Sequence, residues 1–112
     1  MTADLIDTAT YAELCDAMGD AFAAELATTF LDDAPNMFAD LKQGAADGDA
    51  DAFRRAAHSI KSNAEIFGAT ALTAAARDME LSGLTDTSAA SIPALEAVYA
   101  DTAAALGALL NA

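Results

Sequence analysis

The most informative stretch of this chain reads Ala56-Ala57-His58-Ser59-Ile60-Lys61-Ser62-Asn63-Ala64-Glu65-Ile66-Phe67-Gly68-Ala69 and contains its only histidine. At about 100° per residue, a set of apolar side chains in this region shares one side of a helix, within roughly 40° of Phe53. The set is Phe53, Ala57, Ile60, Ala64 and Phe67. His58 lies about 140° away from that stripe. The pattern predicts a helix with a buried apolar stripe and an exposed imidazole on its other side.

A lone histidine is either a hydrogen-bonded core residue or a surface residue, and the angular position of His58 argues against the core. Its neighbours argue against an unimportant surface position. Arg54 lies four residues before it and Lys61 three residues after it, which makes both of them neighbours on a helix. With Arg55, these are three of the five basic residues in a chain of formal net charge −13. An acidic protein gathers most of its positive charge around one imidazole, which favours a functional role for His58.

The run His58-Ser59-Ile60-Lys61-Ser62, followed by Gly68-Ala69, resembles the signature of histidine-containing phosphotransfer (HPt) domains. That signature has His, any residue, an aliphatic residue, Lys and Gly, and a Gly-Ala pair closes the helix. Ser62 departs from it, because the family most often has glycine there, and Asn63 and Ala64 replace small polar residues common in the family. The similarity covers roughly residues 20 to 84, through Glu25-Leu26, Phe30-Leu31, Pro35, Leu41, Gly48-Asp49, Leu72 and Met79-Glu80.

This resemblance implies a phosphorelay protein in which His58 accepts a phosphoryl group from a receiver-domain aspartate and passes it to another receiver aspartate. Lys61, one helical turn further on, is placed to balance the phosphoryl charge. Arg54 either shares that role or is a solvated surface charge. Ser62 either hydrogen-bonds the ring or the phosphoryl group, or leaves space for the partner.

Partner docking is expected around the same histidine. Arg55, Glu65 and Ile66 are the candidate contacts, with Phe38 as a further apolar one. Ile66 has an alternative, because it also fits as a core residue packed against an N-terminal helix. The expected partners are response-regulator receiver domains and a hybrid sensor histidine kinase.

Catalytic machinery is not expected on this chain. It has no glycine-rich phosphate loop, so we expect no ATP site and no enzyme activity of its own. It has no Glu-x-x-His pair for a di-iron centre, and Glu65 lies two turns from His58, so we expect no bound metal and no other cofactor. The resemblance implies that the catalytic aspartate and its Mg²⁺ belong to the partner receiver. Two alternatives remain open: a helical adaptor that docks a receiver or kinase domain without carrying phosphate, and a plain structural module.

Composition and charge exclude several classes of partner and location. The negative charge argues against nucleic acid and anionic membranes as partners, because both need a basic surface. No apolar run approaches about 18 residues and the N-terminus lacks a signal peptide, so we expect no membrane span and a cytoplasmic location. Cys15 has no intramolecular disulfide partner and is expected to be a buried structural thiol. We further expect a monomer, and a free-standing protein rather than an excised domain.

Alanine richness, few prolines and one valine predict an all-α domain over residues 1–112, with residues 1–9 loose. Short connections favour an antiparallel up-down four-helix bundle preceded by a short extra helix. The first expected helix covers residues 10–18 and starts with a Thr10/Glu13 capping box, and the second covers 20–46, is capped by Asp20 and is kinked at Pro35. The histidine helix is expected to run from Asp49 or Asp51 to Gly68. A helix over residues 70–83, capped by Thr70, and a last helix that begins at Pro93 are expected to follow.

Overall fold

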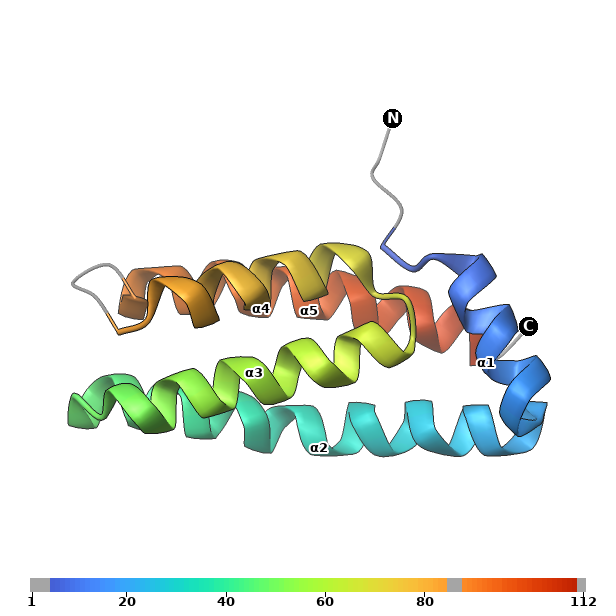
Figure 1. Ribbon diagram of the computed structural model, residues 1–112, viewed down its shortest axis with the longest axis horizontal. Coiled ribbons are helices and arrows are strands. Elements are labelled where there is room, and N and C mark those ends of the chain that lie inside the picture. The colour runs from blue at the N-terminus through green and yellow to red at the C-terminus, as the bar shows by residue number, and fades with distance from the viewer. Residues whose placement is uncertain (1–4, 85–87, 111–112) are drawn as a thin grey trace.

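The computed structural model describes residues 5–84 and 88–110, and every regular element in those residues is an α-helix. The helices are α1 (Thr8–Met18), α2 (Asp20–Asp47), α3 (Ala50–Ile66), α4 (Thr70–Ser82) and α5 (Ser88–Leu110). Successive helices from α2 to α5 run antiparallel, and α1 crosses the end of the bundle where α3 turns into α4 (Figure 1). The predicted four-helix bundle with an extra N-terminal helix is confirmed.

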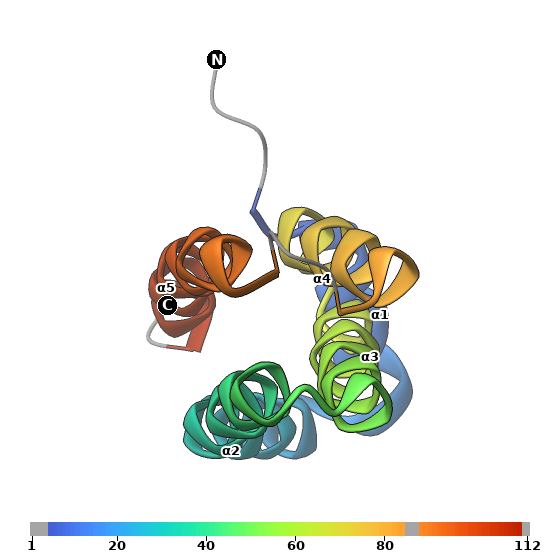
Figure 2. The ribbon, with the colours of Figure 1, turned by 90° about the vertical axis from the view of Figure 1, so that its left-hand side faces the viewer.

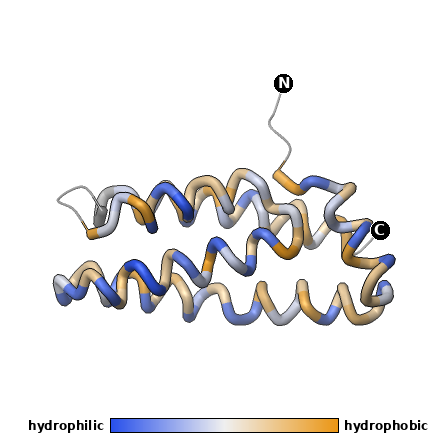
Figure 3. The backbone as a smooth tube through the Cα atoms, in the orientation of Figure 1, coloured by the Kyte–Doolittle hydropathy of each residue, from blue (hydrophilic) through white to orange (hydrophobic). Residues whose placement is uncertain are grey.

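The bundle places α3 between α2 and α4, and α5 on the opposite side between the same two helices (Figure 2). This arrangement leaves one long side of α3 facing away from the other three helices of the bundle. Apolar and polar segments alternate along the helices, as expected when each helix buries one face only (Figure 3). The outward side of α3 is therefore available for a functional site.

The apolar stripe predicted for the histidine helix is confirmed, because all of its members are buried. Phe67, at the end of that stripe, stacks on Phe30 of α2 with ring centroids 5.6 Å apart. Phe38 packs against Tyr99 of α5 at 5.3 Å and is buried. The expectation that Phe38 contributes to docking is therefore wrong, because its ring fills the space between α2 and α5.

One long helix across Pro35 was predicted, and α2 continues through this residue. Proline has no backbone N–H, so the carbonyl of Leu31, four residues earlier, loses its helical partner. The Tyr99 hydroxyl of α5 donates to that carbonyl at 3.5 Å. A side chain from another helix thus reaches the acceptor that the proline leaves vacant, and helix α2 does not end there.

Two glycines fix how the helices meet α3. At Gly44 a Cβ atom would lie 2.8 Å from the backbone nitrogen of Phe53, so glycine permits the close approach of α2 to α3. Gly68 has φ +69° and a Cβ there would lie 2.8 Å from the Asp7 carbonyl oxygen. Its own carbonyl accepts the Asp7 backbone N–H at 2.6 Å. Gly68 therefore ends the histidine segment, as predicted, and also anchors the start of α1.

Helix starts differ from several sequence predictions. Asp7, not Thr10, caps α1: its carboxylate accepts the Ala9 N–H at 3.1 Å, and the Thr10 hydroxyl donates to that carboxylate instead of capping. Gly19 precedes α2, so Asp20 lies in the first turn rather than at the cap. Ala69 is the capping position of α4, so Thr70 begins the helix rather than capping it. The prediction for α3 is confirmed at Asp49, whose carboxylate accepts the Ala52 N–H at 3.0 Å.

Helix α5 begins at Ser88, several residues before the predicted start at Pro93. Its Ser91–Leu110 segment is long and apolar enough to span a membrane by length and composition, contrary to the expectation that no such run exists. The segment carries Glu96 and Asp101 and packs against α2 and α4, so this is weak evidence for a span. Residues 1–4 of the predicted loose N-terminus, and 85–87 before α5, lie outside the described residues.

Cys15 of α1 is half-buried rather than buried as expected. Desolvation and the nearby Asp20 carboxylate raise the pKa of its thiol, against an opposing hydrogen bond with Tyr11. The thiol lies at the α1–α2 end of the bundle and takes no part in the site around His58.

Candidate functional site

His58 lies on the outward side of α3, with 56% of its side chain exposed. The exposure predicted from helical spacing is confirmed, because the ring sits across the helix from the buried Phe53, Ala57 and Ile60. Both ring nitrogens contact polar side chains, so the orientation of the ring depends on polar neighbours.

The first polar neighbour is Glu80, near the C-terminal end of α4. One of its carboxylate oxygens, Oε2, lies 2.7 Å from His58 Nδ1, and the other, Oε1, lies 2.9 Å from Lys61 Nζ. The hydrogen bond from Lys61 holds the pKa of the Glu80 carboxyl below its ordinary value of 4.5, burial opposes this shift, and the contact with His58 adds to it. Glu80 is therefore an ionised carboxylate at neutral pH, held between a cation and the imidazole.

An ionised carboxylate only accepts hydrogen bonds, so the proton between Glu80 and the ring belongs to His58 Nδ1. In the neutral imidazole Nε2 then carries the lone pair. The chemistry of the pair thus assigns the tautomer: Nδ1 is fixed against α4 and Nε2 is the nitrogen left for reaction.

Glu80 was not among the predicted site residues, although it belongs to the Met79-Glu80 pair in the family resemblance. A signal for it does exist in the sequence. Helices α3 and α4 are antiparallel and joined by a short turn, so residues about as far after the turn as His58 is before it lie beside His58, and Glu80 is among them. The prediction missed it because it considered neighbours of His58 along one helix only.

Ser62 lies one turn after His58, and its hydroxyl oxygen is 3.3 Å from Nε2. Of the two open alternatives for Ser62, this contact favours a hydrogen bond to the ring over mere space for a partner. Lys61 thus contacts the Glu80 carboxylate that holds Nδ1, whereas Ser62 contacts Nε2 itself.

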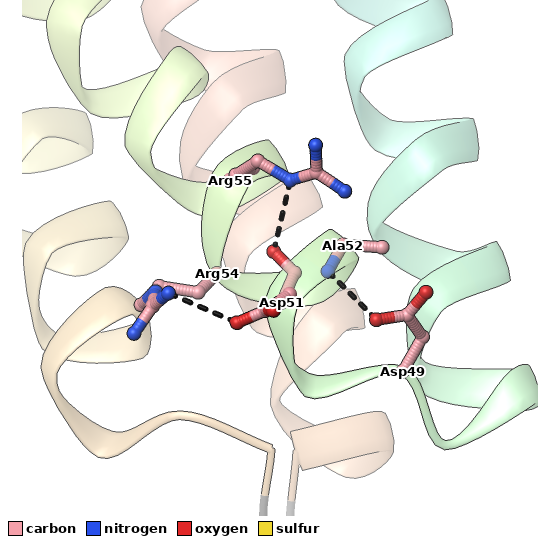
Figure 4. A network of polar contacts seen from close by, with 5 residues as sticks. All are labelled: Asp49, Asp51, Ala52, Arg54 and Arg55. Atoms are coloured by element: carbon pink, nitrogen blue, oxygen red, sulfur yellow. Dashed lines mark hydrogen bonds and ion pairs between the residues drawn. The ribbon is translucent and has the colours of Figure 1, made fainter.

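The two arginines near His58 are arranged differently (Figure 4). Arg54 Nη2 lies 3.0 Å from Asp51 Oδ1, and Arg55 Nε donates to the Asp51 backbone carbonyl at 3.3 Å. Neither arginine forms a hydrogen bond or ion pair with His58 or Glu80 in the described part of the chain. The predicted basic cluster is therefore divided, with Lys61 in the site and both arginines held at the start of α3.

The two remaining docking candidates lie at the other end of α3. Glu65 is exposed and lines an open surface hollow together with Arg77 of α4. Ile66 is 44% exposed, so the alternative that it packs in the core is wrong. Among the described residues no group of three or more His, Cys, Asp or Glu side chains is arranged to hold a metal ion.

Comparison with known proteins identifies the family of the chain. The family model of the Hpt domain matches residues 25–111. The chain belongs to the Hpt family. Its structure is similar to the crystal structure of histidine-containing phosphotransfer protein B (HptB) from Pseudomonas aeruginosa PAO1, with a TM-score of 0.88 and 26% sequence identity, covering 98% of this chain and 97% of that chain. No curated protein sequence matches the chain.

Family membership settles the general activity. The chain is a histidine phosphotransfer protein of a phosphorelay. Members of this family carry phosphoryl groups, interact with receiver and kinase domains, and are not in general enzymes with an ATP site.

Proposed function

We propose that His58 is the phosphoryl acceptor, that it takes the group on Nε2 from an aspartyl phosphate of one receiver domain, and that it passes the group to an aspartate of another. The observation that carries this proposal is the 2.7 Å contact between His58 Nδ1 and Glu80 Oε2 on an exposed ring. It holds one nitrogen and leaves the other as a nucleophile facing the partner.

The transfer step follows from this tautomer. The Nε2 lone pair forms the N–P bond, while the bond between phosphorus and the receiver carboxylate oxygen breaks and its electron pair leaves with the carboxylate. The ring gains positive charge, and its Nδ1 proton remains next to the Glu80 carboxylate, which stabilises that charge. Glu80 is thus a positioning residue that both orients the ring and favours the charged product.

Lys61 supplies the positive charge nearest to the ring. Its side chain is four-fifths buried and its ammonium group is held by Glu80 at 2.9 Å, so its position is fixed before a partner arrives. A fixed charge stabilises an incoming phosphoryl group without the cost of ordering a free lysine. Arg54 remains a candidate second cation, because its exposed ion pair with Asp51 contributes little and is easily exchanged for a phosphoryl contact.

Docking is proposed on the side of the bundle that carries His58. Of the four exposed large apolar side chains in the described residues, Met18, Phe22 and Ile66 lie on α1, α2 and α3, which pack against one another, and Leu81 lies on α4 next to Glu80. Exposed apolar side chains next to polar ones, as Ile66 is next to Glu65, are typical of a protein–protein interface, and Arg55 at the start of α3 is proposed as a further contact. The proposed partners are receiver domains and a hybrid sensor histidine kinase, met by a cytoplasmic monomer.

The chain supplies no transfer catalyst of its own in this proposal. Phosphoryl transfer depends mainly on positioning and on charge stabilisation by metal ions. We assign the Mg²⁺ and the reacting aspartate to the receiver domain, and expect neither ATP nor nucleic acid to bind this chain, whose net charge is −13.

The test is phosphotransfer from a phosphorylated receiver domain to the wild-type chain and to His58→Gln. We expect label on the wild type alone, labile in acid and stable in base as a phosphohistidine is, with both proteins equally folded by circular dichroism. Label on the variant contradicts the assignment of His58. Receiver binding without label on either protein supports a non-phosphorylated adaptor instead.

A further inference from the structure

The Ser62 hydroxyl contacts the nitrogen that is proposed to react. Its oxygen lies 3.3 Å from His58 Nε2, while Nδ1 is engaged by Glu80 at 2.7 Å. Because Nδ1 carries the ring proton, Nε2 can only accept a hydrogen bond, and Ser62 is the donor. The hydroxyl therefore uses the lone pair of Nε2 in the unphosphorylated protein.

This hydrogen bond and the N–P bond exclude each other, because both require that one lone pair. During acceptance the Ser62–Nε2 hydrogen bond breaks, the N–P bond forms, and the P–O bond to the receiver aspartate breaks with its electrons leaving on the carboxylate. The proton of Nδ1 stays in the hydrogen bond with Glu80. The released hydroxyl has another acceptor within reach, the backbone carbonyl of His58 four residues earlier, which is a common partner for a serine inside a helix.

We propose that Ser62 stabilises the unphosphorylated imidazole and thereby shifts the phosphotransfer equilibrium from His58 toward the receiver domain. This inference rests on the proposed function and differs from the sequence-based alternative in which Ser62 hydrogen-bonds the phosphoryl group. Glycine, the usual residue here in the family, has no hydroxyl, so the effect distinguishes this chain from the common pattern. A neutral hydrogen bond of this kind corresponds to about a two- to tenfold change in an equilibrium constant.

The experiment measures the equilibrium ratio of phosphohistidine to phosphoaspartate after mixing the chain with a phosphorylated receiver at equal concentrations. Ser62→Ala removes the hydroxyl and keeps Cβ, and Ser62→Gly removes both. We expect both variants to raise the ratio about two- to tenfold over wild type. Ser59→Ala is the matched control, because Ser59 is an exposed serine next to His58 on the same helix with no hydrogen bond to the ring, and it should leave the ratio unchanged.

A second readout separates this role from a general effect on the helix. In ¹⁵N NMR of the imidazole, Ser62→Ala should move the Nε2 resonance while the Nδ1–H tautomer, set by Glu80, persists. An unmoved Nε2 resonance, or a ratio that stays constant or falls in Ser62→Ala, overturns the inference while leaving labelled His58 as the acceptor. Absence of label on the wild type overturns the proposed function, and this inference with it.

Discussion

The cations on the two sides of His58 come from one short run of sequence but lie in different environments. Lys61 pairs with Glu80 of another helix at 2.9 Å, and both side chains are largely buried, 20% and 18% exposed. Arg54 pairs with Asp51 of its own helix at 3.0 Å, and both are largely exposed, 59% and 77%. Ion pairs shielded from water are stronger and better fixed than exposed ones. Closeness to the histidine in sequence therefore does not decide which cation belongs to the site.

The largest effect is expected when Lys61, the cation shielded from water, is removed. Lys61→Ala should slow phosphoryl acceptance by His58 about 10- to 100-fold, because one fixed charge at a reacting centre typically contributes at least that much. The measurement is the initial rate of transfer from a phosphorylated receiver. Lys42→Ala is the control, since Lys42 forms an ion pair with Glu96 of α5 and should leave the rate unchanged. Equal rates in both variants would refute a special role for Lys61.

The second test removes the carboxylate that joins Lys61 to the ring. Glu80→Ala should slow acceptance about tenfold, because the neutral imidazole is then divided between two tautomers and Lys61 loses its anchor. The ¹⁵N spectrum of the ring should change from one tautomer to a mixture. A slow variant with an unchanged tautomer would place the role of Glu80 elsewhere, for example in docking.

Glu80 also predicts a pH dependence of folding. The hydrogen bond from Lys61 lowers the pKa of the carboxyl below 4.5 in the folded protein, so its contribution to stability is complete above the unfolded pKa and disappears as the pH falls through the folded value. The difference in unfolding free energy between wild type and Glu80→Gln should be constant near neutral pH and shrink below about pH 4.5. Urea unfolding over a pH series measures it. A difference that grows on acidification would mean that Glu80 is not the ionised partner.

Part of the site could be predicted from the sequence, and the contacts that were not predicted share one cause. Helical spacing along α3 was enough to predict the buried stripe from Phe53 to Phe67 and the exposed His58, because both are properties of one helix. Glu80 contacts His58 from the next helix, and the Tyr99 hydroxyl that serves the Leu31 carbonyl comes from α5, far along the chain. Their roles exist only after the bundle has assembled, so no pattern within a single segment indicates them.

The errors at the helix starts have a related origin. Thr10 and Glu13 match a capping box, yet Asp7 caps α1, because the Asp7 backbone is also fixed by its 2.6 Å hydrogen bond to Gly68. The contact of Asp7 with the α3–α4 turn thus decides whether Asp7 or Thr10 caps α1, although both residues suit that position locally. Propensity alone gives no basis for that choice.

The smallest expected effect is at the exposed cation. Arg54→Ala should change the rate of phosphoryl acceptance less than about threefold, because an exposed pair within one helical turn contributes little and is screened by salt. Asp51→Asn, which frees Arg54 without removing it, should have a similarly small effect or a slight increase in rate at low ionic strength. A tenfold loss in Arg54→Ala would show that the arginine leaves Asp51 to contact the phosphoryl group. The shielded and exposed cations would then act together, and the ion pair with Asp51 would describe only the unphosphorylated state.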